Sequence, residues 1–280
     1  MTRRKRATPA PPDLAADTYG SGPGVVLIHG QPGSAADWNR VAPLLSNNHR
    51  VIVPDRPGYG RTAGEATGFA GNADALVRTL DQLSSAKAIM VGHSWGGGVA
   101  IAAAALHPER VSGLVLVASV RPGETLGWVD RMLASRLLGD ALAAVTIGST
   151  SMVLRNKKVR DLVERRFDGR PREVVRALEG VTGARTSAPV WRSFVSEQRR
   201  LFDELDGLAT AVQTISVPTI VLSGGADHIV PATVGERLAA SIKNAELRVV
   251  PGAHHLLPLD HPGEIATAVE DVDRAAQDPG

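Results

Sequence analysis

The sequence contains no cysteine among its 280 residues. This absence excludes disulfide bonds, a thiolate metal site and a cysteine nucleophile, and it is compatible with the cytoplasmic location that we expect. The chain also lacks any run of about 18 uninterrupted apolar residues, so we expect no membrane-spanning segment. It has no internal repeats.

An excess of either charge is also missing from most of the chain. The net charge is +2, but Arg3, Arg4, Lys5 and Arg6 alone exceed that value, and the remaining residues are slightly acidic. The basic balance therefore gives no case for nucleic-acid binding. We interpret residues 1–12 as a disordered basic and proline-rich tail, because no apolar segment of the kind found in a secretory signal follows the arginines.

Short apolar runs of strand length alternate with helical patterns along most of the chain. Each run is apolar on both faces, which is typical of a parallel sheet covered by helices on both sides. We therefore predict an α/β fold with a mostly parallel central sheet. The predicted strands cover residues 25–28, 50–53, 88–91, 114–118, 219–222 and 247–250.

The alternation stops between residues 122 and 207, where several helical patterns occur without a strand-like run. We predict that residues 122–207 form a helical insertion, a lid, within a core made of residues 13–121 and 208–280. The sequence gives no indication of the oligomeric state.

One strand-like run ends in a motif with chemical meaning, Gly92-His93-Ser94-Trp95-Gly96. A strand, a sharp turn with serine at its apex and a helix form the context that exposes a nucleophilic hydroxyl. A side chain at Gly92 or Gly96 would collide with the neighbouring strand or helix. We therefore predict that Ser94 is a nucleophile.

A serine nucleophile needs a base, and the base needs an acid to orient it. Asp227 follows the 219–222 run, and His254 and His255 follow the last run, so each lies where a parallel sheet binds its ligands. The stretch after residue 118 reads Ser119-Val120-Arg121-Pro122 and offers no carboxylate. The order serine, acid, histidine is the one expected after such a turn.

These motifs together resemble the α/β-hydrolase superfamily from about Tyr19 to the last helix. The resemblance is carried by His29-Gly30-x-Pro32, Asp55-x-Pro57-Gly58-Tyr59-Gly60, the serine motif, Gly224-x-x-Asp227 and Gly252-Ala253-x-His255. It implies that His255, rather than His254, is the base.

The resemblance also implies roles outside the triad. It places the backbone N–H groups of Gln31 and Trp95 in the oxyanion hole, and it implies no cofactor. It suggests bracing roles for His29 and Asp55. The histidines at 228, 254, 255 and 261 match no standard set of metal ligands, so we expect no metal.

Among the reactions of this superfamily, serine chemistry on an acyl carbon fits the residues present. We expect a hydrolase that cleaves a carboxylic ester or lactone through an acyl-enzyme, acting on a small ester-like substrate. The alternatives are a carbon–carbon bond hydrolase for β-diketone-like acids, a cofactor-free perhydrolase of the haloperoxidase type, and a non-enzymatic small-molecule receptor.

Overall fold

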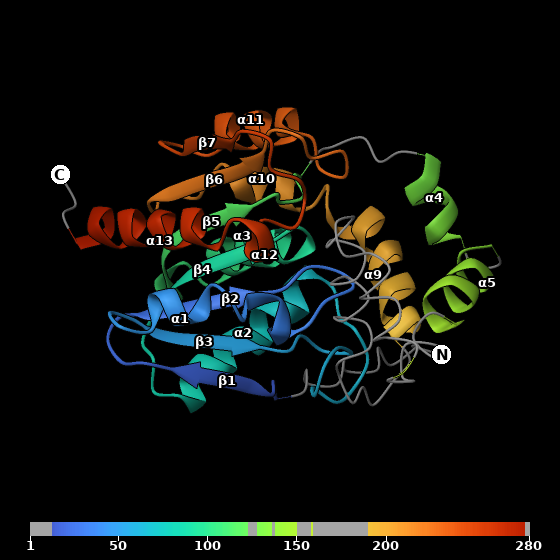
Figure 1. Ribbon diagram of the computed structural model, residues 1–280, viewed down its shortest axis with the longest axis horizontal. Helices are drawn as coiled ribbons and strands as arrows, with labels where there is room; N and C mark the ends of the chain where they lie inside the picture. The colour runs from blue at the N-terminus through green and yellow to red at the C-terminus, as the bar shows by residue number, and fades with distance from the viewer. Residues whose placement is uncertain (1–12, 123–127, 136–137, 150–157, 159–189, 278–280) are drawn as a thin grey trace, which may run out of the picture.

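The computed structural model describes residues 13–122, 128–135, 138–149, 158 and 190–277, and its centre is a seven-stranded sheet (Figure 1). Across the sheet the strands follow the order β1-β3-β2-β4-β5-β6-β7. Strand β1 is antiparallel to β3, and the other described pairings are parallel. This confirms the predicted fold class. The strands are β1 (Ala16–Tyr19), β2 (Gly24–Ile28), β3 (Arg50–Pro54), β4 (Ala88–His93), β5 (Val111–Val117), β6 (Thr219–Gly224) and β7 (Glu246–Val250).

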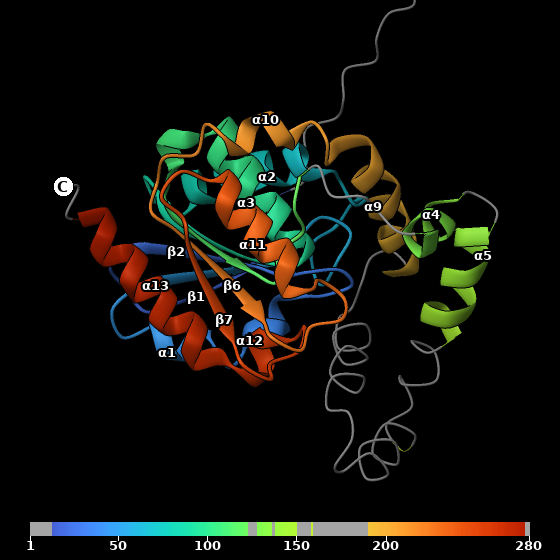
Figure 2. The ribbon, with the colours of Figure 1, turned by 90° about the horizontal axis from the view of Figure 1, so that it is seen from above.

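Helices bury both faces of the sheet (Figure 2). On one face lie α2 (Phe69–Gln82), α3 (Trp95–Leu106), α10 (Leu208–Val212) and α11 (Ala232–Ser241), and on the other lie α1 (Ala42–Leu45), α12 (Leu257–Asp260) and α13 (Pro262–Gln277). Side chains alternate between the faces, as a strand's period of two requires. In β2, Val26 and Ile28 belong to the first core, whereas Val25 and Leu27 belong to the second.

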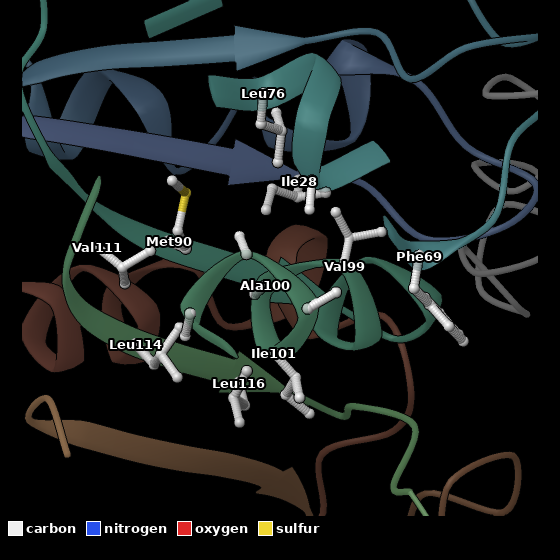
Figure 3. Packing of buried hydrophobic residues seen from close by; sticks show 14 of the residues in the cluster. Ile28, Phe69, Leu76, Met90, Val99, Ala100, Ile101, Val111, Leu114 and Leu116 are labelled. Atoms are coloured by element: carbon white, nitrogen blue, oxygen red, sulfur yellow. The ribbon is translucent and has the colours of Figure 1, made fainter. Parts of the chain in front are cut away.

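Helix α3 lies in the first core, where Val99 and Ile101 pack close to Ile28 and Leu116 of the sheet (Figure 3). Its residues from Trp95 to Ala104 are all buried. A helix that is apolar on all sides is expected in the interior of a protein. The position of α3 is therefore fixed by packing from its first residue to Ala104, and the turn that precedes it is fixed with it.

The sequence has helical patterns around Trp38 to Leu45 and from Asp74 to Leu83, and the structure differs from both. Helix α2 begins at Phe69 rather than at Asp74, because the Glu204 carboxylate accepts the Phe69 N–H at 2.7 Å and supplies the cap that Gly68 lacks. The helix expected around Trp38 to Leu45 is two pieces, the 3₁₀ helix η1 (Ala35–Trp38) and α1. Pro43 has no N–H to continue a helix, so it occupies the first turn of a new one.

The described part of residues 122–207 contains helices and no strand. We call α4 (Trp128–Ala134), α5 (Leu138–Ala143) and α9 (Val190–Glu204) the inserted helices, and the π-helix η3 (Ala144–Gly148) follows α5. The inserted helices pack against one another and lie beyond one end of the sheet in both views (Figures 1 and 2). The rest of the predicted insertion lies outside the described residues, so its boundaries and its role as a lid stay predictions. Within the described parts of the chain, no helix has both the length and the apolar character needed to cross a bilayer.

Candidate functional site

Ser94 lies on a sharp turn between the central strand β4 and α3. Its φ of 54° and ψ of −119° are unusual for a residue with a side chain, and its N–H donates to Val117 O at 2.9 Å. The flanking glycines are required here. A Cβ on Gly92 would lie 2.3 Å from Gly96 O, and one on Gly96 would lie 2.5 Å from Ile28 O. The predicted steric reason for both glycines is therefore confirmed.

Three predicted residues come together at this turn. The Nε2 atom of His255 lies 3.1 Å from Ser94 Oγ, and its Nδ1 atom lies 2.8 Å from Asp227 Oδ2. Ser94 and Asp227 are separated by more than a hundred residues in the chain, but β4 and β6 place both beyond carboxyl ends of parallel strands. The structure thus forms a continuous hydrogen-bonded line from serine through histidine to aspartate.

The Asp227 carboxylate is held in one orientation by the backbone. Its Oδ1 atom accepts the N–H groups of Ile229 at 2.8 Å and Val230 at 2.9 Å, which leaves Oδ2 for His255. Burial alone would raise the pKa of Asp227, but the hydrogen bonds from His255 and from these two amides outweigh it and lower the pKa. Asp227 is therefore ionised beside the histidine.

His93, the residue before Ser94, forms a hydrogen bond to the backbone of His255. Its Nε2 atom lies 2.9 Å from His255 O, and since a carbonyl can only accept, Nε2 carries the proton. Burial, together with the charge on His255, lowers the pKa of His93 to about 3. His93 therefore stays neutral at physiological pH and fixes the backbone of His255.

His254, the residue before His255, takes no part in this hydrogen-bonded line. His254 is exposed, and its Nδ1 atom lies 3.0 Å from Ala226 O. The structure thus places His255, and not His254, next to Ser94. Among the residues that the structure describes, no group of three or more His, Asp or Glu side chains is arranged to hold a metal ion.

Trp95 directly follows the serine, and Gln31 lies in a loop that passes beside it. Trp95 is the first residue of α3, so its N–H lacks a partner within the helix. Gln31 follows Gly30, whose own Cβ position would lie only 3.2 Å from Ser94 Cβ, so this loop runs directly past the nucleophile. The Gln31 N–H donates to no acceptor in the described chain. We call residues 29–32 the oxyanion loop, after the role that the resemblance implies.

The side chains of His29 and Asp55 both form hydrogen bonds to backbone groups of neighbouring loops. The Nε2 atom of buried His29 accepts the Arg56 N–H at 3.0 Å, so its Nδ1 atom carries the proton and donates to Gly30 O at 2.8 Å. Burial, with a further contribution from Arg56, lowers the pKa of His29 well below its ordinary value. Asp55 accepts the Ala35 N–H at 2.7 Å and the Arg61 side chain at 2.8 Å. Neither residue contacts Ser94 in the hydrogen-bond network.

A buried ion pair that the sequence analysis did not single out lies behind the oxyanion loop. Arg56 and Glu197 are both 0% exposed, and the Arg56 guanidinium donates to both carboxylate oxygens of Glu197. The same guanidinium donates to His29 O at 2.9 Å and to Gly30 O at 2.8 Å. Tyr59 donates its hydroxyl to Glu197 at 2.6 Å. Arg56 occupies the variable position of the Asp55-x-Pro57 motif, and Glu197 lies in α9, where nothing in the sequence marked it.

The fold and the serine–histidine–aspartate line are those of an α/β hydrolase. The chain belongs to the alpha/beta hydrolase family, whose model matches residues 25–268.

Three of its relatives show the breadth of that family. A 2-hydroxymuconate semialdehyde hydrolase of Pseudomonas sp. (strain CF600) is 30% identical over 264 residues, which cover 90% of this chain and 84% of the relative. A pimeloyl-(acyl-carrier protein) methyl ester esterase of Edwardsiella ictaluri (strain 93-146) is 30% identical, covering 88% of this chain and 91% of the relative. A solved structure of a thermophilic esterase from Thermogutta terrifontis matches with a TM-score of 0.70 and 25% identity, covering 95% of this chain and 94% of that one.

Proposed function

We propose that this protein is a serine hydrolase that cleaves a carboxylic ester or lactone. The observation that carries the proposal is the hydrogen-bonded line from Ser94 Oγ through His255 to Asp227. A serine hydroxyl becomes nucleophilic when an adjacent base removes its proton, and His255 Nε2 lies within reach of that proton. Two of the relatives, one by sequence and one by structure, are esterases, which agrees with this chemistry.

Each half-reaction uses the same residues. Ser94 Oγ attacks the acyl carbon while its proton passes to His255, and the carbonyl oxygen becomes an oxyanion between the N–H groups of Gln31 and Trp95. Collapse of this intermediate breaks the bond to the leaving alcohol, which takes the proton from His255 and leaves an acyl-enzyme. Water then attacks the acyl carbon and gives a proton to His255. Collapse of this second intermediate breaks the bond to Ser94 Oγ, which takes the proton back from His255, and the acid is released. Ionised Asp227 stabilises the imidazolium that forms twice.

The test is hydrolysis of p-nitrophenyl esters from acetate to decanoate by the wild type and by Ser94→Ala. We expect serine-dependent turnover and a loss of at least about a thousandfold in kcat for Ser94→Ala. Ser119→Ala is the matched control, because Ser119 is buried beside the turn but donates its hydroxyl to Val120 O, away from His255. Turnover that survives in Ser94→Ala would refute the proposal.

A second candidate is hydrolysis of a carbon–carbon bond in a β-diketone-like acid. It is favoured by the relative named 2-hydroxymuconate semialdehyde hydrolase, which is 30% identical to this chain. Such a substrate calls for a cation to hold its carboxylate. Among the described arginines, the charge of Arg56 is already matched by Glu197, and Arg131 on α4 is exposed. Arg136, Arg155 and Arg160 lie outside the described residues. Ester hydrolysis comes first because two of the relatives are esterases.

A fluorophosphonate probe separates the two candidates from a non-enzymatic receptor. Labelling of Ser94 in a protein that is inert toward esters would favour the carbon–carbon reaction, and β-diketone acids would then be assayed. A protein that neither turns over esters nor reacts with the probe would instead favour a receptor.

A further inference from the structure

The oxyanion loop presents an N–H to substrate through a peptide whose other side is held by Arg56. The carbonyl of Gly30 and the N–H of Gln31 belong to one planar trans peptide, so they point in opposite directions. Whatever fixes the Gly30 carbonyl therefore fixes the direction of the Gln31 N–H. Two donors converge on that carbonyl, Arg56 Nη2 at 2.8 Å and His29 Nδ1 at 2.8 Å.

Arg56 controls both of these donors. It supplies the first from its guanidinium, and its backbone N–H bonds to His29 Nε2, which forces the proton of His29 onto Nδ1. A third bond runs from Arg56 Nε to His29 O at 2.9 Å. A cation that donates to a peptide carbonyl also polarises the peptide, so the opposite N–H becomes a stronger donor.

Glu197 sets the orientation of that guanidinium. Its carboxylate receives the guanidinium as a two-pronged acceptor and is itself held by the Tyr59 hydroxyl. On the other side, the Arg56 guanidinium carbon lies 4.5 Å from the centroid of the Trp95 ring, the residue that carries the second oxyanion donor. Arg56 thus contacts the segments of both donors, while its counter-ion comes from an inserted helix.

We propose that Arg56 and Glu197 are positioning residues for the oxyanion hole, through which α9 sets the direction and strength of the Gln31 N–H. The inference rests on the proposed serine hydrolase function. Because the oxyanion exists only in the transition state, disturbing the pair should reduce transition-state stabilisation much more than it reduces the affinity for substrate.

The decisive variant is the double substitution Arg56→Met with Glu197→Leu. Apolar groups on both sides leave no unpaired buried charge, so the double variant costs less stability than removal of either partner alone. His29 O and the Tyr59 hydroxyl lose their partners, so kcat is compared per folded molecule. We expect the double variant to fold and to lose roughly 10- to 100-fold in kcat, somewhat less than the loss of a whole oxyanion donor. KM should stay within about threefold of the wild-type value, since ground-state binding does not use the oxyanion hole.

A second variant, Glu197→Gln, keeps the shape of the side chain and removes its charge. Its carbonyl oxygen can accept from only one side of the Arg56 fork, and its amide replaces the oxygen that accepts from Tyr59 and Arg56 Nη2. We expect about a tenfold loss in kcat per folded molecule, together with a lower unfolding midpoint, because Arg56 keeps its charge without a buried counter-ion. Ser193→Ala is the matched control. Ser193 also lies in α9, and its hydroxyl donates to Gly58 O at 2.7 Å in the turn after β3 rather than to the oxyanion loop.

A second readout is inhibition by a trifluoromethyl ketone, which forms a tetrahedral oxyanion with Ser94. Its inhibition constant should rise by the same factor as kcat falls in both pair variants, and should stay unchanged in Ser193→Ala. Folded pair variants with wild-type kcat and wild-type inhibition would overturn this inference and leave the proposed function intact. A wild type whose turnover does not depend on Ser94 would overturn the proposed function itself, before any pair variant is measured.

Discussion

The substitution Asp227→Asn tests the tautomer of His255, the proposed base. In the native protein Asp227 Oδ1 accepts two backbone N–H groups, so the carbonyl oxygen of an asparagine will keep that place. Its amide nitrogen must then replace Oδ2 and face His255 Nδ1. Because an amide NH₂ only donates, Nδ1 becomes the acceptor and the ring proton moves to Nε2. An Nε2 that already carries a proton cannot accept the one from Ser94.

The size of the effect follows from this single proton. We expect kcat for a p-nitrophenyl ester near neutral pH to fall about 10⁴-fold, the loss that a wrong tautomer causes in a serine triad. That factor corresponds to about 5.5 kcal/mol in the barrier. The unfolding midpoint in urea should stay near the wild-type value, because asparagine keeps both backbone bonds.

Asp227→Ala is the comparison variant, because we expect it to lose more stability but less activity than Asp227→Asn. Alanine leaves the N–H groups of Ile229 and Val230 without their acceptor, so this variant should be the less stable one. It does not impose the wrong tautomer, so per folded molecule it should be more active than Asp227→Asn. An asparagine variant within tenfold of the wild type, or more active than the alanine variant, would refute the argument.

Two further predictions concern stability. His93 has a pKa of about 3 in the folded protein, whereas an unfolded histidine has a pKa of about 6.5. Between these pH values only the unfolded state binds the proton. The free energy of unfolding should therefore fall as pH drops from about 6.5 toward 3, by up to about 1.4 kcal/mol per pH unit. His93→Gln, which keeps a donor for His255 O, should flatten that slope in urea titrations, and equal slopes would contradict a buried neutral His93. Gly96→Ala places a Cβ 2.5 Å from Ile28 O, so we expect a loss of about 3 kcal/mol and of activity; an unchanged urea midpoint would show that the turn can relax.

The sheet and the serine–histidine–aspartate line were accessible from sequence for a physical reason. Buried parallel strands must be apolar on both faces, so runs such as Val25–Ile28 are conspicuous in the chain. The ends of such strands meet at one edge of the sheet, so the sequence alone predicts that Ser94, Asp227 and one of His254 and His255 lie together there. The choice of His255 rests on the resemblance to the family. Element ends were less accessible: α2 begins at Phe69 because of Glu204, a contact across the chain that local pattern does not encode.

The Arg56–Glu197 pair marks the limit of sequence reasoning. A glutamate among the charged residues of α9 looks like part of a solvated helix face, and only the fold shows that it is fully buried. The two residues are 141 positions apart, and their pairing depends on how α9 packs at the end of the sheet. Nothing in periodicity or motif spacing specifies that packing.

The proposed role of the oxyanion loop explains the position of the pair. A peptide that must offer its N–H to substrate cannot use that N–H in a strand or helix, and its loop carbonyls also lose their regular partners. The carbonyls of His29 and Gly30 are buried, so each needs a donor from elsewhere. A guanidinium supplies several donors in one rigid plane, which a lysine does not. Its charge then needs a buried partner, because an unpaired cation there would cost far more than the bonds return. Three features thus follow from one requirement of the proposed function: the Gln31 N–H has no acceptor among the described residues, Arg56 lies behind it, and Glu197 on α9 pairs with Arg56.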